Sequence, residues 1–316
     1  MEPALVSTII PVFNRRDMLR EAVASVLAQT HRPIEIIIVD DGSTDETADV
    51  ADELARQHAG VLRAIHIPNG GPGCAREAGR ALTRGEFIQY LDSDDVLMPK
   101  KFELQLAALR ECPDCGAAYG WTRERDAAGN RESLPRKRTG ERIETMFPSM
   151  LTSRWWDTPT PLYRSTVVDR AGAWTGLRAE EDWEYDCRIA VQGVSLAYVP
   201  DWVCEIRVGL DDRLSGRGEA ALRDRARAHL LMLEHAAAAD IPRSSPEMQF
   251  FSRDLFHLAR QCGIAGFRDE SRQLLTAAVK ISAARDLHAY NFVARIIGMR
   301  GAGTVAQAID RLRTRE

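Results

Sequence analysis

Short apolar runs alternate with helix-length segments in the first part of the chain, and this alternation limits the possible folds more than any other feature. The runs are rich in β-branched and aromatic residues, so we expect buried strands at 5–13, 34–40, 62–67 and 86–92. The segments between them carry apolar residues at helical spacing, at 17–30, 43–60 and 71–85. Such a series predicts right-handed crossovers, a parallel sheet and helices on both of its faces.

Further elements are predicted around this series. Ser43 and Glu46 have the spacing of a capping box at the start of the 43–60 helix. A helix is expected at 99–112 and another strand at 116–122. The basic run at 123–142 is expected to form a hairpin tip and loop, either as a solvated face or as a surface for an anionic substrate.

Clusters of small polar and charged residues follow each of the first four predicted strands. Because the carboxyl ends of parallel strands lie at one edge of a sheet, these clusters are expected to converge where ligands bind in open α/β sheets. The same residue types also form ordinary turns and helix caps, but four clusters at one edge favour a binding site. They lie at 14–16, 40–43, 69–71 and 92–95.

The last cluster, within YLDSDDVLMP at 90–99, contains three carboxylates. Two like charges 4 Å apart repel by about 1 kcal/mol in water and by more near a protein interior. A metal ion, a basic partner or solvent must therefore neutralise Asp92, Asp94 and Asp95. A hard divalent cation fits this pattern, because Mg²⁺ or Mn²⁺ takes one or two carboxylates and completes its shell with phosphate and water.

A second acidic group lies far along the chain in GLRAEEDWEYDCRIAVQG, residues 176–193. Asp182 falls in the first turn of a predicted helix, where the helix dipole favours an ionised carboxylate. An ionised carboxylate at the edge of a cleft can take a proton from a hydroxyl. By itself, an acidic triplet such as 180–182 is also an ordinary way to start a helix.

Several common functions are disfavoured. No G-x-G-x-x-G follows the first strand, and the similar stretch at 71–76 has Arg76 in place of the last glycine. No P-loop pattern and no G-x-S-x-G elbow occur either. The net charge of −4 argues against a dedicated nucleic-acid-binding protein. Hydride transfer, P-loop ATP hydrolysis and serine-based hydrolysis are therefore weak hypotheses.

The cysteines and the apolar runs bear on the compartment. Six cysteines in a chain of this length do not make a disulfide scaffold and favour a reducing cytoplasm. Cys112 and Cys115 form a C-x-x-C pair at a helix end, but no second pair or matched histidines complete a zinc site. No apolar run reaches the ~20 residues that span a bilayer, and the N-terminal stretch lacks a signal-peptide pattern. We expect a cytoplasmic protein, soluble or peripheral at the inner face of the membrane.

Four stretches of the chain are informative through their order and spacing. They are VSTIIPVFNR, IIIVDDGSTDET, NGGPGCAREAGRALTRGEFIQYLDSDDVLMP and EEDWEYDCRIAVQG, within residues 4–208. In this order they resemble the motifs of the family 2 glycosyltransferases of GT-A fold. The resemblance implies an α/β fold with a Rossmann-like mixed sheet flanked by helices. It also implies transfer of a sugar, with inversion, from a nucleotide diphosphate.

The resemblance further implies roles for residues of the donor site. Pro11 and Phe13 would pack beside the nucleoside, and Asp41 would hydrogen-bond to uracil or another base. Arg76 would contact the nucleotide or its phosphates, while Asp92 and Ser93 would lie near ribose and phosphate. The donor-binding residues expected in this way are Pro11, Phe13, Asn14, Asp41, Arg76, Asp92 and Ser93.

The same resemblance assigns the metal and the base. Asp94 would be the main ligand of Mn²⁺ or Mg²⁺, with Asp92 as a second ligand. Asp182, paired in sequence with Glu181, would be the general base that activates the acceptor.

This chain departs from the family pattern at two places. The segment that reads ARN in many members is 75–77 here, with Arg76 retained and Glu77 beside it. Many members also have an R-x-H element whose histidine assists the metal or the diphosphate; this chain keeps Arg207 but has Gly209 at the position of the histidine. Asp211, Asp212 or an extra water molecule could take its place, so this departure bears on metal affinity more than on sugar transfer.

The leading hypothesis is an inverting, metal-dependent glycosyltransferase that uses a nucleotide sugar, most readily a UDP-sugar. The acceptor would be the hydroxyl of a glycan, a glycolipid or another glycoconjugate. One alternative is a glycosyltransferase-like binding or scaffold protein, which the missing histidine favours. Another is a sugar nucleotidyltransferase, against which the absence of a Gly-rich loop after the first strand counts.

The sequence predicts a catalytic domain at 1–213, with a nucleotide-binding half at 1–98 and an acceptor-binding half at 99–213, and an all-helical region at 214–316. Acceptor recognition is expected within 123–179, where Trp155 and Trp156 either stack on a sugar or belong to the core. The helical region could form a homo-oligomer or approach anionic lipid head groups. The arginines considered for lipid contact are Arg295, Arg300, Arg311, Arg313 and Arg315.

Overall fold

The computed structural model describes residues 4–209, 218–282 and 284–313. These residues divide into two compact units, and each is described by itself. The α/β unit comprises Met1–Met146, Arg154–Leu177 and Gln192–Arg213. The helical unit comprises Phe147–Ser153, Arg178–Val191 and Leu214–Glu316.

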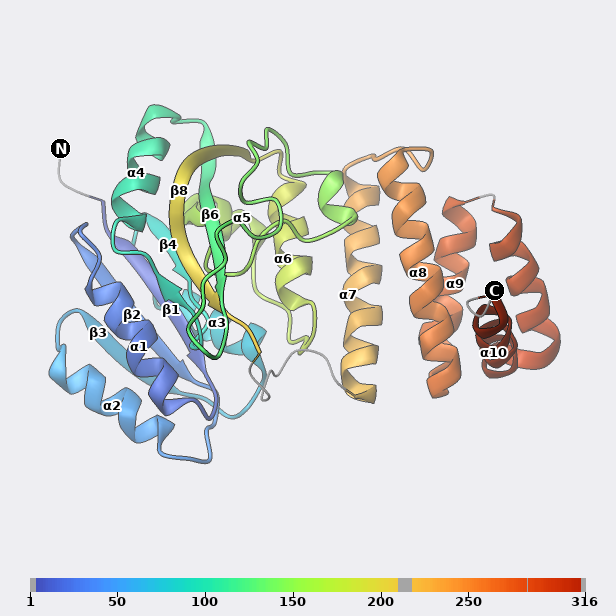
Figure 1. Ribbon diagram of the computed structural model, residues 1–316, viewed down its shortest axis with the longest axis horizontal. Coiled ribbons are helices and arrows are strands. Elements are labelled where there is room, and N and C mark those ends of the chain that lie inside the picture. Colours follow the sequence, from blue (N-terminus) through green and yellow to red (C-terminus); the bar gives the residue numbers. More distant parts are fainter. Residues whose placement is uncertain (1–3, 210–217, 283, 314–316) are drawn as a thin grey trace. The chain divides into compact units, whose positions relative to one another are not determined.

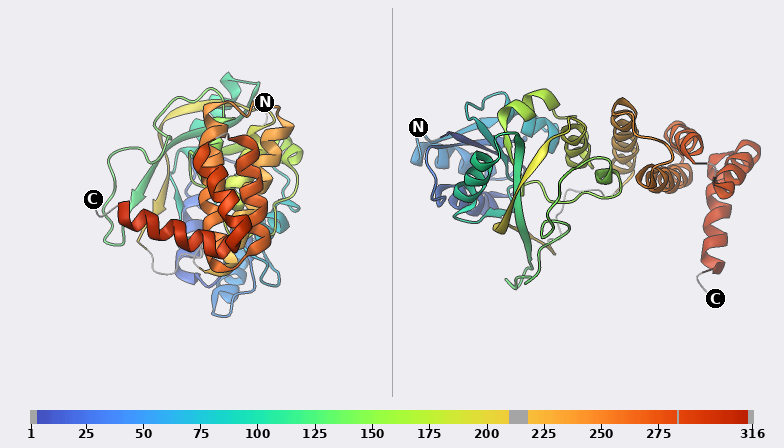
Figure 2. Two further views of the ribbon diagram at one scale, coloured as in Figure 1. Left: turned by 90° about the vertical axis from the view of Figure 1, so that its right-hand side faces the viewer. Right: turned by 90° about the horizontal axis from the view of Figure 1, so that it is seen from above.

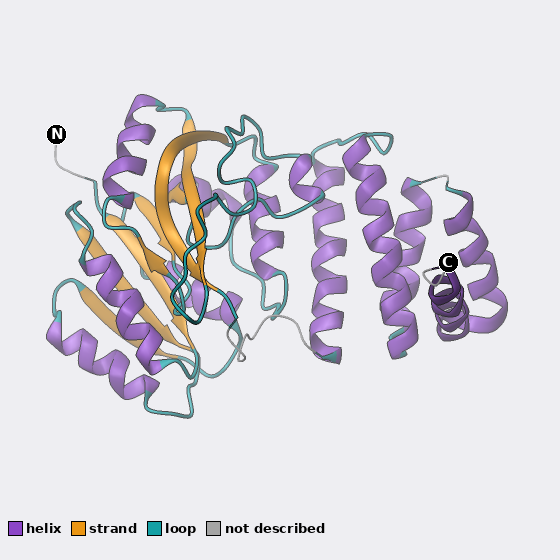
Figure 3. Ribbon diagram, viewed as in Figure 1, coloured by secondary structure: helices purple, strands orange, loops and turns teal. Residues whose placement is uncertain are grey.

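The α/β unit is built on an eight-stranded mixed sheet with the order β3-β2-β1-β4-β7-β6-β8-β5 (Figures 1 and 3). The first four of these strands are parallel, as predicted. In contrast, β7 runs antiparallel to both of its neighbours, and β5 runs antiparallel to β8. The strands are β1 (Val6–Val12), β2 (Ile34–Asp40), β3 (Leu62–His66), β4 (Phe87–Tyr90), β5 (Val96–Leu97), β6 (Cys115–Arg125), β7 (Leu162–Arg164) and β8 (Ser195–Arg207).

Helices cover both faces of the sheet because the central strands are apolar on both sides. On one face, Ile10 and Ile36 pack in a core with side chains of α1, α2 and α4. On the other face α3 lies so close that a Cβ added to Gly79 would come within 2.5 Å of the Ile9 side chain and 3.1 Å of the Val39 side chain. The helices of this unit are α1 (Arg16–Leu27), α2 (Thr47–Gln57), α3 (Pro72–Arg80), α4 (Lys101–Glu111) and α5 (Ser165–Ala171).

The capping box predicted at Ser43 and Glu46 is not formed. Helix α2 begins later, at Thr47, without a side-chain cap. The Ser43 hydroxyl instead accepts the N–H of Asn14 at 3.0 Å, and Glu46 forms an ion pair with Arg16. The Ser43 and Glu46 side chains therefore bind residues that follow β1 instead of capping α2.

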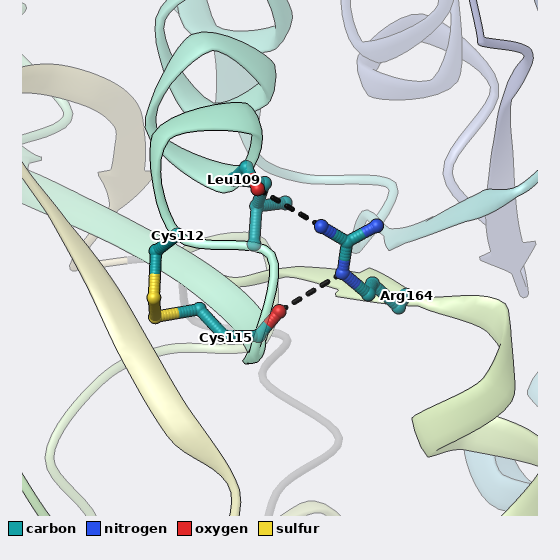
Figure 4. Close-up of a disulfide and its surroundings, with 4 residues drawn as sticks. All are labelled: Leu109, Cys112, Cys115 and Arg164. Atoms are coloured by element: carbon teal, nitrogen blue, oxygen red, sulfur yellow. Dashed lines mark hydrogen bonds between the residues drawn. A yellow bond between two sulfur atoms is a disulfide. The ribbon is translucent and has the colours of Figure 1, made fainter.

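Cys112 and Cys115 are joined by a disulfide, which the cysteine pattern did not predict (Figure 4). Cys112 follows the last turn of α4 and Cys115 opens β6, so the short turn holds their Cα atoms 5.3 Å apart, within disulfide range. Arg164 donates to the carbonyl oxygens of Leu109 and Cys115, at 2.9 Å each. Guanidinium and disulfide thus fix the same helix-to-strand connection.

The helical unit consists of η1 (Ser149–Leu151), α6 (Glu181–Ala190), α7 (Glu219–Ala238), α8 (Pro246–Ala265), α9 (Arg268–Ile281) and α10 (Arg285–Arg313). Helices α7, α9 and α10 each pack against α8, and α10 also packs against α9 (Figure 2). Helix α10 is kinked at Gly298, whose φ of 78° and ψ of 164° are not helical. Ser245 caps α8 by accepting the N–H of Met248, and Gly266 ends α8 in the left-handed region. Among the described residues, no helix has the length and apolar character required to cross a bilayer.

Candidate functional site

The loops after β1 and β2 are joined by hydrogen bonds at the carboxyl ends of the strands. Asn14 lies in the left-handed region (φ 51°), accepts the N–H of Thr44 at 2.8 Å and donates to the Thr44 hydroxyl at 3.2 Å. Pro11 is buried in β1, and Phe13 is half-buried just beyond its end. The side chains expected beside the nucleoside therefore lie on one strand end, and their contact with a nucleoside stays a prediction.

Asp41 ties the ends of three strands together. Its carboxylate oxygens accept the N–H groups of Gly70 and Gly71, at 2.7 and 2.8 Å. Its own N–H donates to the carbonyl oxygen of Val12 at 2.8 Å. Asp41 is buried, so it shapes the loop after β3 in addition to any contact with a base.

Two arginines pair with carboxylates of the acidic cluster that follows β4. The Arg76 guanidinium donates to Asp92 at 2.7 Å, and the Arg15 guanidinium forms an ion pair with Asp94. Arg15 follows β1 and Arg76 lies on α3, which follows β3, so both lie on segments that follow parallel strands. Of the three neutralising agents left open by the sequence, the structure supplies basic side chains of the chain itself.

These arginines do not offset the negative charge completely. Burial raises the pKa of Asp94; the charge of Arg15 opposes this rise, the carboxylate of Asp92 adds to it, and the pKa lies above its ordinary value. Burial, followed by the charges of Asp94, Asp92 and Asp157, raises the pKa of Asp95 well above its ordinary value. Burial is the largest cause of both shifts and neighbouring carboxylates add to it, so an added cation would stabilise the ionised forms.

Asp95 is a structural member of this cluster. Its own N–H donates to the carbonyl oxygen of Asp92 at 3.0 Å, closing a tight turn. Its carboxylate accepts the N–H of Arg207, at the end of β8, at 3.2 Å. Ser93, between Asp92 and Asp94, is also buried. The turn thus presents Asp92 and Asp94, whose side chains are 31% and 16% exposed.

Trp174 is a site residue that sequence reasoning missed. The Arg76 guanidinium lies over its ring, 4.8 Å from the ring centroid, and Tyr90 meets the same ring edge to face at 4.9 Å. The backbone N–H of Trp174 donates to the carboxylate of Glu77, the acidic neighbour of Arg76, at 3.1 Å. Trp174 and Glu77 therefore hold the part of α3 that carries Arg76. No local pattern around residue 174 indicates this role.

Asp92 and Asp94 fit a divalent cation that binds together with a diphosphate. Two partly exposed carboxylates are what Mg²⁺ or Mn²⁺ takes when phosphate and water supply its other ligands. Within 4–209, 218–282 and 284–313, no group of three or more His, Cys, Asp and Glu side chains could hold a metal by itself. At the R-x-H position, the guanidinium of Arg207 forms an ion pair with Glu21. Asp211 and Asp212 lie outside the described residues.

Glu181 and Asp182 belong to the helical unit. Both lie in the first turn of α6, Glu181 buried and Asp182 half-buried, which agrees with the predicted helix start. Asp182 also accepts the N–H of Trp183 at 2.7 Å. The field of the helix N-terminus favours its ionised form.

Several residues of the region expected to recognise the acceptor are buried or held by ion pairs within the α/β unit. Trp155 and Trp156 are buried core residues, 1% and 0% exposed, so neither offers a face for stacking on a sugar. The basic run at 123–142 is held by internal ion pairs instead of forming a free cationic face. Arg123 and Arg131 pair with Glu205, and Arg136 and Lys137 pair with Asp157.

The family model of glycosyl transferase family 2 matches residues 7–168. An uncharacterised glycosyltransferase of Rickettsia felis is 42% identical over 106 residues, which are 34% of this chain and 17% of that protein. The putative glycosyltransferase EpsH of Bacillus subtilis is 31% identical over 222 residues, 66% of this chain and 62% of EpsH. The chain thus spans less than two thirds of the length of these curated relatives.

A solved structure is similar along nearly the whole chain. Residues 1–349 of TarS from S. aureus, in complex with UDP-GlcNAc, give a TM-score of 0.69 at 18% identity, covering 97% of this chain and 91% of that one. At this identity the likeness shows the fold, and it agrees with the GT-A class expected from the sequence.

Proposed function

The chain belongs to glycosyl transferase family 2, and we propose that it transfers a sugar from a nucleotide-diphosphate sugar to an acceptor hydroxyl with inversion. The observation that carries the proposal is the pairing of Asp92 with Arg76 and of Asp94 with Arg15 at one edge of the parallel strands. The TarS structure contains UDP-GlcNAc. This supports a UDP-sugar as the first donor to test.

On donor binding, the arginines of this edge would pair with the diphosphate and the carboxylates would pair with a cation. A diphosphate brings negative charge that Arg76 and Arg15 can take, because guanidinium groups bind phosphate through paired hydrogen bonds. Asp94 and Asp92 would then hold Mn²⁺ or Mg²⁺, whose chemistry is to neutralise charge on the departing diphosphate. The segments around Pro11, Phe13 and Asp41 would receive the nucleoside.

Sugar transfer needs a base, and Asp182 is the residue proposed for it. Its carboxylate takes the proton of the acceptor hydroxyl as the oxygen forms a bond to the anomeric carbon. The bond from that carbon to the diphosphate breaks on the opposite face, and the nucleoside diphosphate leaves with the bonding electrons. The products are the inverted glycoside, the nucleoside diphosphate and a proton held by Asp182.

A donor panel tests this proposal. Purified full-length protein with Mn²⁺ is offered UDP- and GDP-sugars, and nucleotide release is measured with and without hydroxyl acceptors. We expect slow release from one donor and faster release when a suitable acceptor is present. Release of no nucleotide from any donor that binds would favour a binding or scaffold protein. In the same assay, an Asp182→Asn variant at the wild-type transfer rate would remove Asp182 as the base.

We also propose peripheral contact with the inner face of the cytoplasmic membrane through α10. Phe292 and Ile296 are 66% and 67% exposed, and Arg295 is exposed on the same helical stretch. Arg300 is also exposed, but it lies beyond the kink at Gly298. Exposed apolar and cationic side chains together suit an anionic lipid surface. Arg311, Arg313 and Arg315 lie outside the described side chains. Sedimentation with anionic liposomes should fall in a Phe292→Ser/Ile296→Ser variant; equal sedimentation would dismiss the contact.

A further inference from the structure

The residues on both sides of the Glu181–Asp182 pair are anchored within the helical unit. Glu180 precedes the pair and Trp183 follows it, and the contacts that hold them share one histidine. Helix α7, which supplies two of these contacts, lies beyond the 7–168 region that matches the family model.

Glu180 is fixed in an unusual backbone conformation by two basic side chains of α7. Its φ of 60° and ψ of 18° lie in the left-handed region, which is unfavourable for a residue with a side chain. The Glu180 carboxylate accepts from the Arg225 guanidinium at 2.8 Å. Nδ1 of His229 lies 3.0 Å from its other oxygen and also 3.0 Å from the backbone carbonyl oxygen of Arg225, so the imidazole bridges these two oxygens. Burial raises the pKa of Glu180, but His229 and Arg225 outweigh burial and hold it below its ordinary value. The carboxylate is thus kept ionised at the start of α6.

Trp183 is held by η1 and by the same histidine. Its indole N–H donates to the carbonyl oxygen of Met150 at 2.8 Å. Its ring meets the His229 ring edge to face at 5.6 Å, and His229 is stacked on Phe251 of α8 at 5.5 Å. His229 is only 4% exposed, so packing leaves its ring little freedom. One imidazole therefore contacts both Glu180 and Trp183, which flank the Glu181–Asp182 pair.

We propose that Glu180, Arg225 and His229 form a positioning clamp that aims the carboxylate of Asp182. The clamp residues are positioning residues, because they act through α6. The inference rests on the proposed role of Asp182 as the base, and it makes the helical unit a necessary part of the transferase. A displacement of about 1 Å at a reacting group can cost about 100-fold in rate, so a clamp beside the base has a measurable effect.

A second ion pair between the same two helices provides a matched control. Glu184, which is 1% exposed, pairs with Arg188 at 2.7 Å and with His235 of α7 at 2.8 Å. This pair lies one turn further along α6 and flanks neither Glu181 nor Asp182. Its loss should loosen the packing of α6 on α7 without turning the Asp182 side chain.

The experiment compares His229→Phe with His235→Phe in the full chain. Phenylalanine keeps the ring stacked on Phe251 and removes the contact with Glu180. For His229→Phe we expect kcat to fall about 10- to 100-fold, with the donor KM changed less than about 3-fold, since the proposed donor residues lie in the α/β unit. His235→Phe should keep kcat within about 3-fold of wild type. His229→Gln, which retains a hydrogen-bond donor, should recover most of the rate.

An Asp182→Asn background separates positioning from general stability. If His229 acts through Asp182, adding His229→Phe to Asp182→Asn should lower the residual rate by less than about 2-fold, because the two changes are non-additive. An equal loss of rate in both backgrounds, or an equal loss from His235→Phe, would contradict the proposed clamp.

Two further outcomes separate the clamp from the base assignment. A fully active Asp182→Asn would refute the base assignment, whereas a fully active His229→Phe beside an inactive Asp182→Asn would refute the clamp alone. If His229→Phe does not fold, Glu180→Gln is tested with the same criteria.

Discussion

Two clusters of the α/β unit, in each of which acidic side chains meet arginines, have carboxyl pKa values shifted in opposite directions. Glu205 has three arginine partners, Arg123, Arg125 and Arg131, at 2.9, 3.3 and 2.7 Å. Burial raises the pKa of Glu205, but Arg131 and Arg123 outweigh it and the pKa lies below its ordinary value. In the turn after β4, by contrast, burial and the charges of neighbouring carboxylates raise the pKa of Asp94 and of Asp95.

The comparison separates a structural ion cluster from one suited to binding. Where cations are in excess, the carboxylate is already satisfied and the cluster holds β6, β8 and the basic loop together. Where burial and neighbouring carboxylates raise the pKa values, as at Asp94 and Asp95, an arriving cation would be stabilised. Both clusters look alike as charged residues in the sequence, so their function depends on the balance that folding creates.

The largest expected effect is that of Asp94→Asn. The substitution keeps the shape of the side chain and removes the carboxylate that is the main proposed metal ligand. We expect the rate of nucleotide release with Mn²⁺ and acceptor to fall about 100-fold or more, because several kcal/mol of charge stabilisation are lost. The melting temperature should stay close to that of wild type. A rate within about 3-fold of wild type would show that the anionic cluster does not serve the donor.

The matched substitution in the other cluster is Glu205→Gln. It leaves three arginines around a buried neutral side chain, so we expect the free energy of unfolding to fall by about 3 kcal/mol. At a temperature where the variant is folded, its rate should be close to that of wild type. Urea denaturation and initial rates measure the two quantities. Lost activity without lost stability would reverse the distinction between the clusters.

A smaller effect is expected for Arg76→Lys. Lysine keeps the charge but loses the planar group that lies over Trp174 and donates to Asp92. Donor affinity should fall about 10-fold, which is about 1.4 kcal/mol. Arg80→Lys is the control, because Arg80 lies one turn further along α3 and pairs with Glu77 at 2.7 Å. Equal losses in the two variants would show that only the fold of α3 is affected.

The smallest expected effect concerns Lys101, a buried cation that forms no ion pair with any described carboxylate. It donates to the carbonyl oxygen of Thr160 at 2.7 Å, and burial lowers its pKa from 10.5 to about 7. Between these values the unfolded chain binds the proton and the folded protein does not. Stability should therefore rise with pH, by about 1 kcal/mol from pH 7 to 8. In Lys101→Met this part of the rise should be absent; an identical pH dependence in both proteins would contradict the shift.

Much of the donor edge could be predicted because it follows from topology. Parallel strands bring their carboxyl ends to one edge, so the positions of Arg15, Asp41 and the Asp92–Asp94 turn followed from periodicity and strand order, and Arg76 followed from the family resemblance. The pairing of Arg15 with Asp94 and the contact of Trp174 with Arg76 could not be predicted, because they form only through the fold. The capping box failed for the same reason, since Ser43 bonds to Asn14 across 29 positions of sequence.

The second half of the chain was less predictable. Trp155 and Trp156 carry no pattern that separates a sugar-stacking face from a buried core. The basic run forms ion pairs with Glu205 and Asp157, which lie elsewhere in the sequence, so its exposure could not be predicted from its own residues. The place of α6 in the helical unit also depends on contacts with α7 that no local pattern contains.

We propose that the acidic cluster after β4 binds the nucleotide sugar together with a divalent cation. The most direct measurement is a calorimetric titration of wild type, Asp94→Asn and Glu205→Gln with the donor identified by nucleotide release, each in Mn²⁺ and in EDTA. We expect Mn²⁺-dependent binding by wild type and Glu205→Gln, and at least a 10-fold loss of affinity in Asp94→Asn. Equal Mn²⁺-dependent binding by Asp94→Asn and wild type would contradict it.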